Sequence, residues 1–339
     1  MTACTVAADG IARHAPVRTI HGDTMKAIPR QHALPRSAVS GRPRRRRSQA
    51  ALGLGLLAPA LIILLLLTIA PAIYIFVSSL FNTELMNPGA ARFVGLGNYA
   101  QIVSDPSVWQ SLGVTVLFVV LAVAVELGLG LLLALLLTRK MLENNLLSGL
   151  IILPMAMTPA VSALIFRELL DPNFGWVSYY LQAWGLTSQP IAWLSDPTTS
   201  WIALIGLNVW QWTPFVALIL LAGLQGIPQE PREAAAMDGA NAWQSFLHIT
   251  LPLLRPFIAI SLLLRVIDAF KTFDIIQVLT GGGPGTATET VNLLIYRVAL
   301  QDFNVGAASA LGVCFLILLA IVVGQLLRLF ARYTNVMED

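Results

Sequence analysis

Two long apolar runs flank the polar stretch IPQEPREAAAMDGANAWQSFLHITLPLLRP, residues 227–256. Pro231 stands where a helix can begin without losing a backbone hydrogen bond, and Gly239 stands where that helix would end. The pattern therefore predicts a short helix over residues 229–237. Its alanines, residues 234–236, leave a smooth surface, which suits insertion into a cleft of another protein.

A second short helix is predicted soon after this glycine. Asn241 is a favoured N-cap residue, and Gln244 follows three residues later, as in a capping box. Trp243, Phe246 and Leu247 then fall on one face of the helix. The stretch as a whole is therefore expected to form a pair of short helices between two membrane-length apolar segments.

The same stretch resembles the EAA loop of permease subunits of binding-protein-dependent ABC importers. The residues that carry the resemblance are Glu233-Ala234-Ala235, Asp238-Gly239-Ala240, Phe246, Ile249, Leu251-Pro252 and Pro256. In that family the loop is cytoplasmic, and its short helix lies in a groove of the ATPase subunit. The resemblance implies ATPase-coupling roles for Glu233, Ala234, Ala235, Asp238, Gly239, Ala240, Leu251 and Pro252. The alternative interpretation is an ordinary helical hairpin that joins two membrane spans.

The composition is that of a polytopic membrane protein. Hydrophobic residues make up 56% of the 339 residues and charged residues 12%, whereas soluble domains carry about 25% charged residues. Cys4 and Cys314 are too few for a disulfide framework or a cysteine-based metal site. The four histidines are scattered without the spacing of metal ligands. We expect no metal, no cofactor and no catalytic residue.

Windows of about 20 apolar residues predict an all-α bundle of six transmembrane helices. They cover residues 52–80, 108–137, 146–169, 201–224, 257–279 and 305–327. Arginine and lysine concentrate in alternate connections, which the positive-inside rule assigns to the cytoplasm. This bias predicts that both termini and the loop at residues 228–256 are cytoplasmic. Residues 171–200 are then expected to form short helices at the outer surface.

Residues 1–50 are expected to form a disordered, basic cytoplasmic tail, and residues 51–339 the transmembrane domain. Ten of the 21 Lys and Arg residues lie in the tail, which sustains no apolar period. The arginines at residues 44–47 directly precede a span, which favours a cytoplasmic anchor over a nucleic-acid patch or a twin-arginine export signal. The apolar run that follows is too long for a signal peptide.

Four charged residues lie three apart in the fifth predicted span: Arg265, Asp268, Lys271 and Asp274. Each would cost roughly 2.5–3.5 kcal/mol if it faced lipid, so all four are expected to face protein or a wet cavity. The spacing allows ion pairs along the helix and arranges the four as a slanted stripe. Some can line a pathway while others brace a neighbour, such as the helix that carries Glu126, and both interpretations remain open.

Polar and aromatic side chains are combined in the fourth predicted span. Asn208 and Gln211 provide amide groups and Trp212 provides an aromatic face, a mixture that suits sugar hydroxyls and ring C–H groups. The predicted substrate path therefore comprises Asn208, Gln211, Trp212, Asp268, Lys271 and Asp274.

A second resemblance involves the segment FDIIQVLTGGGPGTAT, residues 273–288, together with Tyr296 and residues 306–308. It looks like the sugar and polyol branch of ABC permeases, with maltose-like and glycerol-phosphate-like importers. The glycines at residues 281–285 lack the Lys and Ser/Thr of a P-loop, so a tight turn is predicted instead. The chain is therefore not expected to hydrolyse ATP itself.

The resemblances together imply a permease subunit of an ATP-driven carbohydrate importer in the bacterial inner membrane, with the fold of a type I ABC importer. The implied partners are a second, different permease, two ABC ATPase subunits, an extracytoplasmic solute-binding protein, a carbohydrate and the lipid bilayer, but no nucleic acid. An ion-gradient-driven secondary transporter is the alternative, and it would have inverted repeats and broken helices at the midplane. A membrane-embedded enzyme fits less well, because no paired carboxylates, nucleophile–base set or metal motif occurs.

Overall fold

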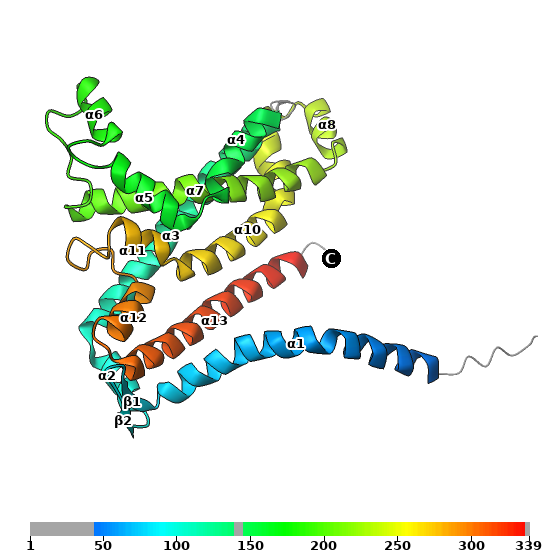
Figure 1. Ribbon diagram of the computed structural model, residues 1–339. Helices are drawn as coiled ribbons and strands as arrows, with labels where there is room; N and C mark the ends of the chain where they lie inside the picture. Colours follow the sequence, from blue (N-terminus) through cyan, green and yellow to red (C-terminus); the bar gives the residue numbers. More distant parts are fainter. Residues whose placement is uncertain (1–43, 139–144, 336–339) are drawn as a thin grey trace, which may run out of the picture. The chain divides into compact units, whose positions relative to one another are not determined.

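The computed structural model describes residues 44–138 and 145–335, mostly as helices (Figure 1). The chain divides into two compact units, residues 1–61 and 62–339. In the first unit, the described part belongs to α1, Arg44–Ser78, which continues into the second unit. Residues 44–50 are thus helical, although they were expected to belong to a disordered tail. Residues 1–43 of that predicted tail lie outside the described residues.

Five described helices are long and apolar enough to cross a membrane, and the count becomes six if one bent pair forms a single span. Four of the five predictions that concern them are confirmed in position, with ends that differ by several residues. These helices are α1, α3 (Pro106–Leu137), α7 (Pro197–Gly226), the helix that ends with α10 (Leu251–Lys271), and α13 (Val305–Asn335).

The third predicted span is broken. Its halves are α4, Asn145–Ala156, and α5, Pro159–Leu169, which meet at an angle of 101°. Thr158 precedes a proline and has extended backbone angles, φ −65° and ψ 133°. A proline disfavours helical geometry in the residue before it, and so the helix stops there and restarts at Pro159. The continuous helix that we predicted over residues 146–169 is therefore wrong.

The fifth predicted span also differs from its prediction. The helix starts well before residue 257, because α9 (Ala242–Ser245) and the π-helical turn η2 (Phe246–Thr250) lead directly into α10. It ends at Lys271, where Thr272 is no longer helical, with φ −58° and ψ 121°. A separate short helix, α11, then covers Asp274–Leu279. Asp274 therefore lies on a different helix from Arg265, Asp268 and Lys271.

A small β-hairpin is the one described exception to the helical fold. Its antiparallel strands are β1, Phe81–Glu84, and β2, Asn87–Phe93. The side-chain amide of Asn98, on α2 (Gly97–Ser104), donates to the carbonyl oxygens of Ser79 at 2.8 Å and Phe81 at 3.0 Å. The remaining helices are α6 (Trp176–Ala183), α8 (Glu230–Met237) and α12 (Val291–Leu300).

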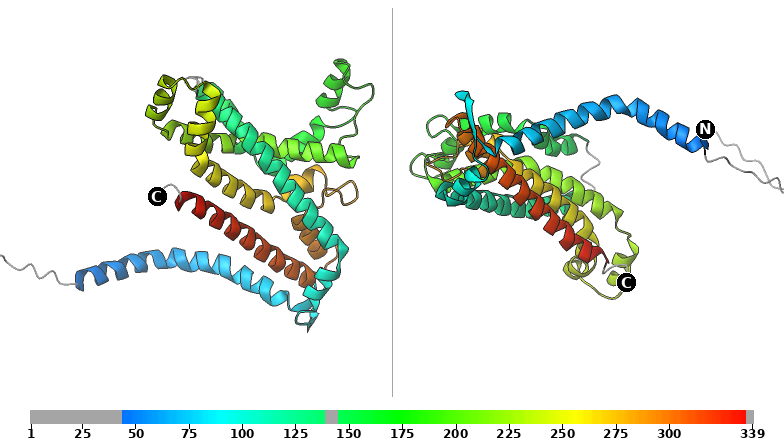
Figure 2. Two further views of the ribbon diagram at one scale, coloured as in Figure 1. Left: turned by 180° about the vertical axis from the view of Figure 1, so that it is seen from behind. Right: turned by 90° about the horizontal axis from the view of Figure 1, so that it is seen from below.

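Helices α3, α7 and α10 form the packed centre of the second unit. Their contacts bury one apolar cluster around Phe118 and Leu207 and another around Val216 and Leu254. Within this unit, α10 and α13 run side by side, and α6 and α8 lie at opposite ends of α7 (Figures 1 and 2). The elements on either side of α7 in sequence are thus separated by the length of a membrane-spanning helix.

The close approach of α3 and α7 requires a glycine, and this generates our first prediction. A Cβ atom at Gly130 would lie 2.6 Å from Cγ1 of Val216, whereas a Cβ atom at Gly128 would meet nothing within 4 Å. We expect Gly130→Ala to destabilise the protein by about 1–3 kcal/mol through overpacking. Thermal unfolding of the detergent-solubilised transporter, followed by size-exclusion chromatography, would measure the loss.

Gly128→Ala is the matched control, because it adds the same methyl group to the same helix at an exposed position. It should leave the unfolding midpoint unchanged. Equal midpoints for the two variants would contradict the close α3–α7 contact.

Candidate functional site

A fully buried ion pair joins α3 to α10 in the membrane-spanning part of the protein. The Arg265 guanidinium donates through Nε to Oε2 of Glu126 at 2.6 Å and through Nη2 to Oε1 at 3.0 Å. The two side chains are 1% and 0% exposed. A bidentate pair of this kind fixes both distance and orientation. The expectation that one charge of the fifth span braces the Glu126 helix is confirmed.

Three further side chains complete this network. Asn208, on α7, donates to Oε1 of Glu126 at 2.7 Å. Arg265 also pairs through Nη1 with Asp268, one turn further along α10, and its guanidinium carbon lies 4.6 Å from the centre of the Trp212 ring. Carboxylates, an amide and an aromatic face thus surround the guanidinium, which offsets the cost of removing it from water.

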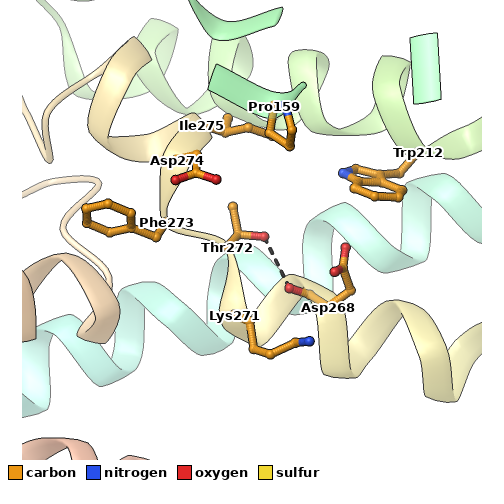
Figure 3. A pocket seen from close by; sticks show the side chains of 8 residues that line it. All are labelled: Pro159, Trp212, Asp268, Lys271, Thr272, Phe273, Asp274 and Ile275. Carbon is orange, nitrogen blue, oxygen red and sulfur yellow. Dashed lines mark hydrogen bonds between the residues drawn. The ribbon is translucent and has the colours of Figure 1, made fainter. Parts of the chain in front are cut away.

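A cavity of about 130 Å³ opens beside this network (Figure 3). Asp274 and Trp212 lie on opposite sides of it, with Thr272 and Asp268 between them. The lining comes from α5, α7, α10 and α11 and consists of Pro159, Trp212, Asp268, Lys271, Thr272, Phe273, Asp274 and Ile275. The cavity therefore lies where the two broken helices meet the centre of the bundle.

Four of the six residues predicted for the substrate path are brought together here. Trp212, Asp268, Lys271 and Asp274 all line the cavity. The Asp268 side chain is 42% exposed although it pairs with Arg265. Within residues 44–138 and 145–335, the Lys271 ammonium makes no ion pair or hydrogen bond. The cavity thus contains charged groups that can still bind a solute.

Asn208 and Gln211 do not line the cavity. Both are fully buried. Asn208 points to Glu126, and Nε2 of Gln211 donates to the Met157 carbonyl oxygen at 3.0 Å, at the break between α4 and α5. Their face of α7 is turned toward α3 and the broken span, which hydropathy alone does not reveal.

Four lining residues were not predicted as site residues: Pro159, Thr272, Phe273 and Ile275. They lie at the two helix breaks, which hydropathy averaged over about 20 residues does not detect. Pro159 carried a usable signal in the sequence, because a proline disfavours helical geometry in the residue before it and thereby marks a helix boundary. Thr272 had no comparable signal in the residues next to it.

The polar loop after α7 has the two-helix structure that its sequence predicts. The capping box of Asn241 and Gln244 is confirmed by reciprocal hydrogen bonds of 2.8 and 2.9 Å. Gly239 has a φ of 81°, as predicted for a residue just past a helix. The Trp243 and Phe246 rings stack with their centres 5.7 Å apart. The predicted capping box and the predicted helix end at Gly239 are therefore confirmed.

Six of the eight predicted coupling residues lie on or directly after α8, an exposed helix that buries none of its residues, whereas Leu251 and Pro252 begin α10. Met237, at its end, is 89% exposed. Arg232 holds α8 to η2, since its Nε and Nη2 donate to Oγ1 of Thr250 at 3.2 and 3.1 Å. An exposed helix that is fastened to the start of a membrane span can transmit a force applied to its free surface.

The glycine-rich segment after α11 forms a turn, as predicted. Gly281, Gly282 and Gly285 have positive φ angles, and a Cβ atom at Gly282 would lie 2.8 Å from Leu293. Beside the turn, Glu289 pairs with Arg297 at 3.0 Å. Burial raises the pKa of the Glu289 carboxyl, and the Arg297 guanidinium opposes that shift. The segment connects α11 to α12.

Comparison with known proteins identifies the family. Residues 126–335 match the family described as "Binding-protein-dependent transport system inner membrane component". The chain belongs to this family. It is accordingly a multi-pass inner-membrane permease subunit that works with a binding protein, and it is not itself an enzyme.

Two curated relatives and one solved structure agree with this assignment. The permease is 38% identical to the trehalose/maltose transport system permease protein MalF of Thermococcus litoralis, over 78% of this chain and 88% of the relative. It is 33% identical to the trehalose transport system permease protein SugA of Mycobacterium tuberculosis, over 87% and 93%. The fold matches a chain of a bacterial ABC transporter that imports alginate, with a TM-score of 0.73 and 22% identity over 85% and 98%. The fold is therefore that of a type I importer permease.

The buried ion pair yields a prediction about stability. Removing one partner leaves an uncompensated charge, so Arg265→Met or Glu126→Met should destabilise the permease by about 3–5 kcal/mol. The double variant, with two apolar side chains, should recover much of this loss. The amount of folded transporter and its unfolding midpoint would measure the coupling.

Lys271→Met is the control for this cycle. It removes a charge of the same span that is exposed and unpaired among the described residues, so the amount of folded protein should hardly change. Additive losses in the Glu126 and Arg265 double variant would contradict a direct structural pair.

Proposed function

We propose that this permease conducts a sugar or polyol across the inner membrane in an ATP-driven importer. The observation that carries the proposal is the cavity that combines the Trp212 ring with Asp268, Lys271 and Asp274. An aromatic face together with hydrogen-bonding groups suits a ring with many hydroxyls. The named activities of the trehalose and maltose relatives support the same class of solute.

The substrate path is assigned to Trp212, Asp268, Lys271 and Asp274, while Asn208 and Gln211 support its walls. Glu126 and Arg265 hold α3 and α10 at the required distance from each other. The broken spans add non-helical backbone at the same place, and irregular backbone inside a membrane is tolerated where it lines a cavity. A solute would therefore meet Asp268, which the ion pair with Arg265 holds in place, together with Lys271, which is unpaired in the part of the chain that the structure describes.

ATP-driven movement is assigned to the loop that carries α8. Its coupling residues are Glu233, Ala234, Ala235, Asp238, Gly239, Ala240, Leu251 and Pro252. The helix is exposed and has small side chains, so it can enter a groove of an ATPase subunit. Closure of two ATPase subunits around ATP would move α8 and thereby favour one of two orientations of the cavity.

The complete transporter in this proposal contains a second, different permease subunit, two ABC ATPases and an extracytoplasmic solute-binding protein. A second permease would complete the walls of the cavity, which is open in the single chain. An ion-gradient-driven secondary transporter would also tolerate the helix breaks found here. The family match favours the ATP-driven importer.

The proposed orientation has both termini and α8 in the cytoplasm, and it can be tested directly. Phe174, two residues before α6, and Met237, the last residue of α8, are both 89% exposed. Helices α6 and α8 lie at opposite ends of α7 (Figure 1). In right-side-out vesicles, a membrane-impermeant maleimide should label Phe174→Cys without treatment and Met237→Cys only after permeabilisation. Both variants would carry serine in place of Cys4 and Cys314.

The reverse labelling pattern would contradict the N-in, C-in topology and would place α8 out of reach of ATP-hydrolysing partners. Labelling of both cysteines in permeabilised vesicles serves as the control for reactivity, since their exposed fractions are equal.

The coupling role predicts the effect of a substitution at Gly239. A side chain at a φ of 81° introduces about 1–2 kcal/mol of strain, although the space around this position is open. Gly239→Val should therefore displace α8, abolish sugar-stimulated ATP hydrolysis by the complete transporter and weaken retention of the ATPase subunits. The membrane spans should insert normally.

Gly226→Val is the matched control, because Gly226 ends α7 without a positive φ and also has no atom within 4 Å of an added Cβ. It should preserve ATP hydrolysis. Normal transport by Gly239→Val with its ATPase bound would show that this loop does not couple the two processes.

A further inference from the structure

We propose that the cavity selects neutral, polyhydroxylated solutes and rejects phosphorylated or otherwise anionic ones. This inference rests on the proposed function, because it assumes that the cavity binds the transported solute. It adds a chemical class that a general carbohydrate assignment leaves open, since sugars and polyols occur both as neutral molecules and as anionic esters.

The charges that face the cavity are unbalanced. Among the described lining residues, Asp268 and Asp274 contribute two carboxylates and Lys271 contributes the cation. Arg265 pairs with Asp268 and with the buried Glu126. The five groups together comprise three carboxylates and two cations, so their formal charge is negative. An added anion would meet this negative charge in a partly desolvated space.

Arg265 cannot serve as a receptor for an anion, although it is the obvious candidate. Its guanidinium is committed to both oxygens of Glu126 and to Asp268, and the side chain is 1% exposed. Trp212 covers it at 4.6 Å from the ring centre. A phosphate group could reach this guanidinium only by displacing Glu126 or Asp268, and either displacement would break an ion pair and leave the phosphate beside the displaced carboxylate.

A neutral polyol matches the same groups. Its hydroxyl groups can donate hydrogen bonds to the carboxylate oxygens of Asp268 and Asp274. Its oxygens can accept hydrogen bonds from the Lys271 ammonium. Its C–H groups can lie against the Trp212 ring, which is only partly buried. A phosphate ester has one hydroxyl fewer and carries in its place a phosphate group, which as a dianion donates no hydrogen bond and would lie beside two carboxylates. Like charges in a binding site are strongly unfavourable.

Matched pairs of solutes provide the test. Glycerol, glucose and trehalose would each be compared with their phosphate esters for binding to the transporter complex in nanodiscs, without its binding protein. Saturation-transfer NMR suits this measurement because it detects millimolar affinities. For at least one pair, we expect the neutral member to bind about tenfold or more tightly than its ester.

Two single variants separate charge selection from a structural effect. Asp274→Asn removes a negative charge and should lower the ratio of the affinity for the neutral member to that for its ester. Lys271→Met removes a positive charge and should raise the same ratio. A role in folding alone would not move the ratio in opposite senses. Gly226→Ala, at the distant end of α7, should leave the ratio unchanged.

The outcomes distinguish this inference from the function on which it rests. Equal or tighter binding of the esters, or a ratio that the two variants leave unchanged, overturns the charge selection but leaves the cavity as the solute site. Failure of both members of all three pairs to bind overturns the proposed site itself. A neutral preference that responds to both variants as described supports both conclusions.

Discussion

The buried pair of Glu126 and Arg265 is the interaction on which the rest of this permease depends. Charges inside a membrane are tolerated only when they are paired, bonded or wetted, because the hydrocarbon cannot solvate them. The pair satisfies this requirement by joining α3 to α10, and Asn208 extends it to α7. Three helices thus acquire a fixed relation to one another, and the side chains beside them acquire fixed positions around the cavity.

The same helix that carries Arg265 also connects the cavity to the exposed loop. The helical segment from Ala242 to Lys271 is continuous through η2, and 30 residues of helix span about 45 Å. Arg232 fastens α8 to Thr250 near the start of this helix. A displacement of α8 could therefore reach Asp268 and Lys271 along one continuous helical segment, which contains the turn η2 and Pro256 as places where it can bend.

Sequence analysis predicted the positions of the helices better than the breaks within them and the neighbours that their polar side chains contact. The capping box at Asn241 and the turn at Gly239 depend on neighbouring residues, so local chemistry was enough to find them. Hydropathy windows sum over many residues and thus missed the breaks at Thr158 and Thr272. The hydrogen-bond partners of Asn208 and Gln211 could not be predicted either. A helix that is apolar on nearly all sides does not indicate which neighbouring element each polar side chain contacts.

The helix breaks and the charged residues pose the same physical problem, because both place polar groups where lipid cannot solvate them. Each interruption of a membrane helix frees backbone groups that lipid cannot satisfy. Side-chain amides satisfy such groups here, since Gln211 donates to the Met157 carbonyl and Asn292 donates to that of Phe270 at 2.7 Å. Because amides satisfy these carbonyl groups, the Asp274 carboxylate and the Lys271 ammonium are not needed at these two carbonyls. The polar groups of this membrane interior are therefore divided between those that complete the backbone and those that line the cavity.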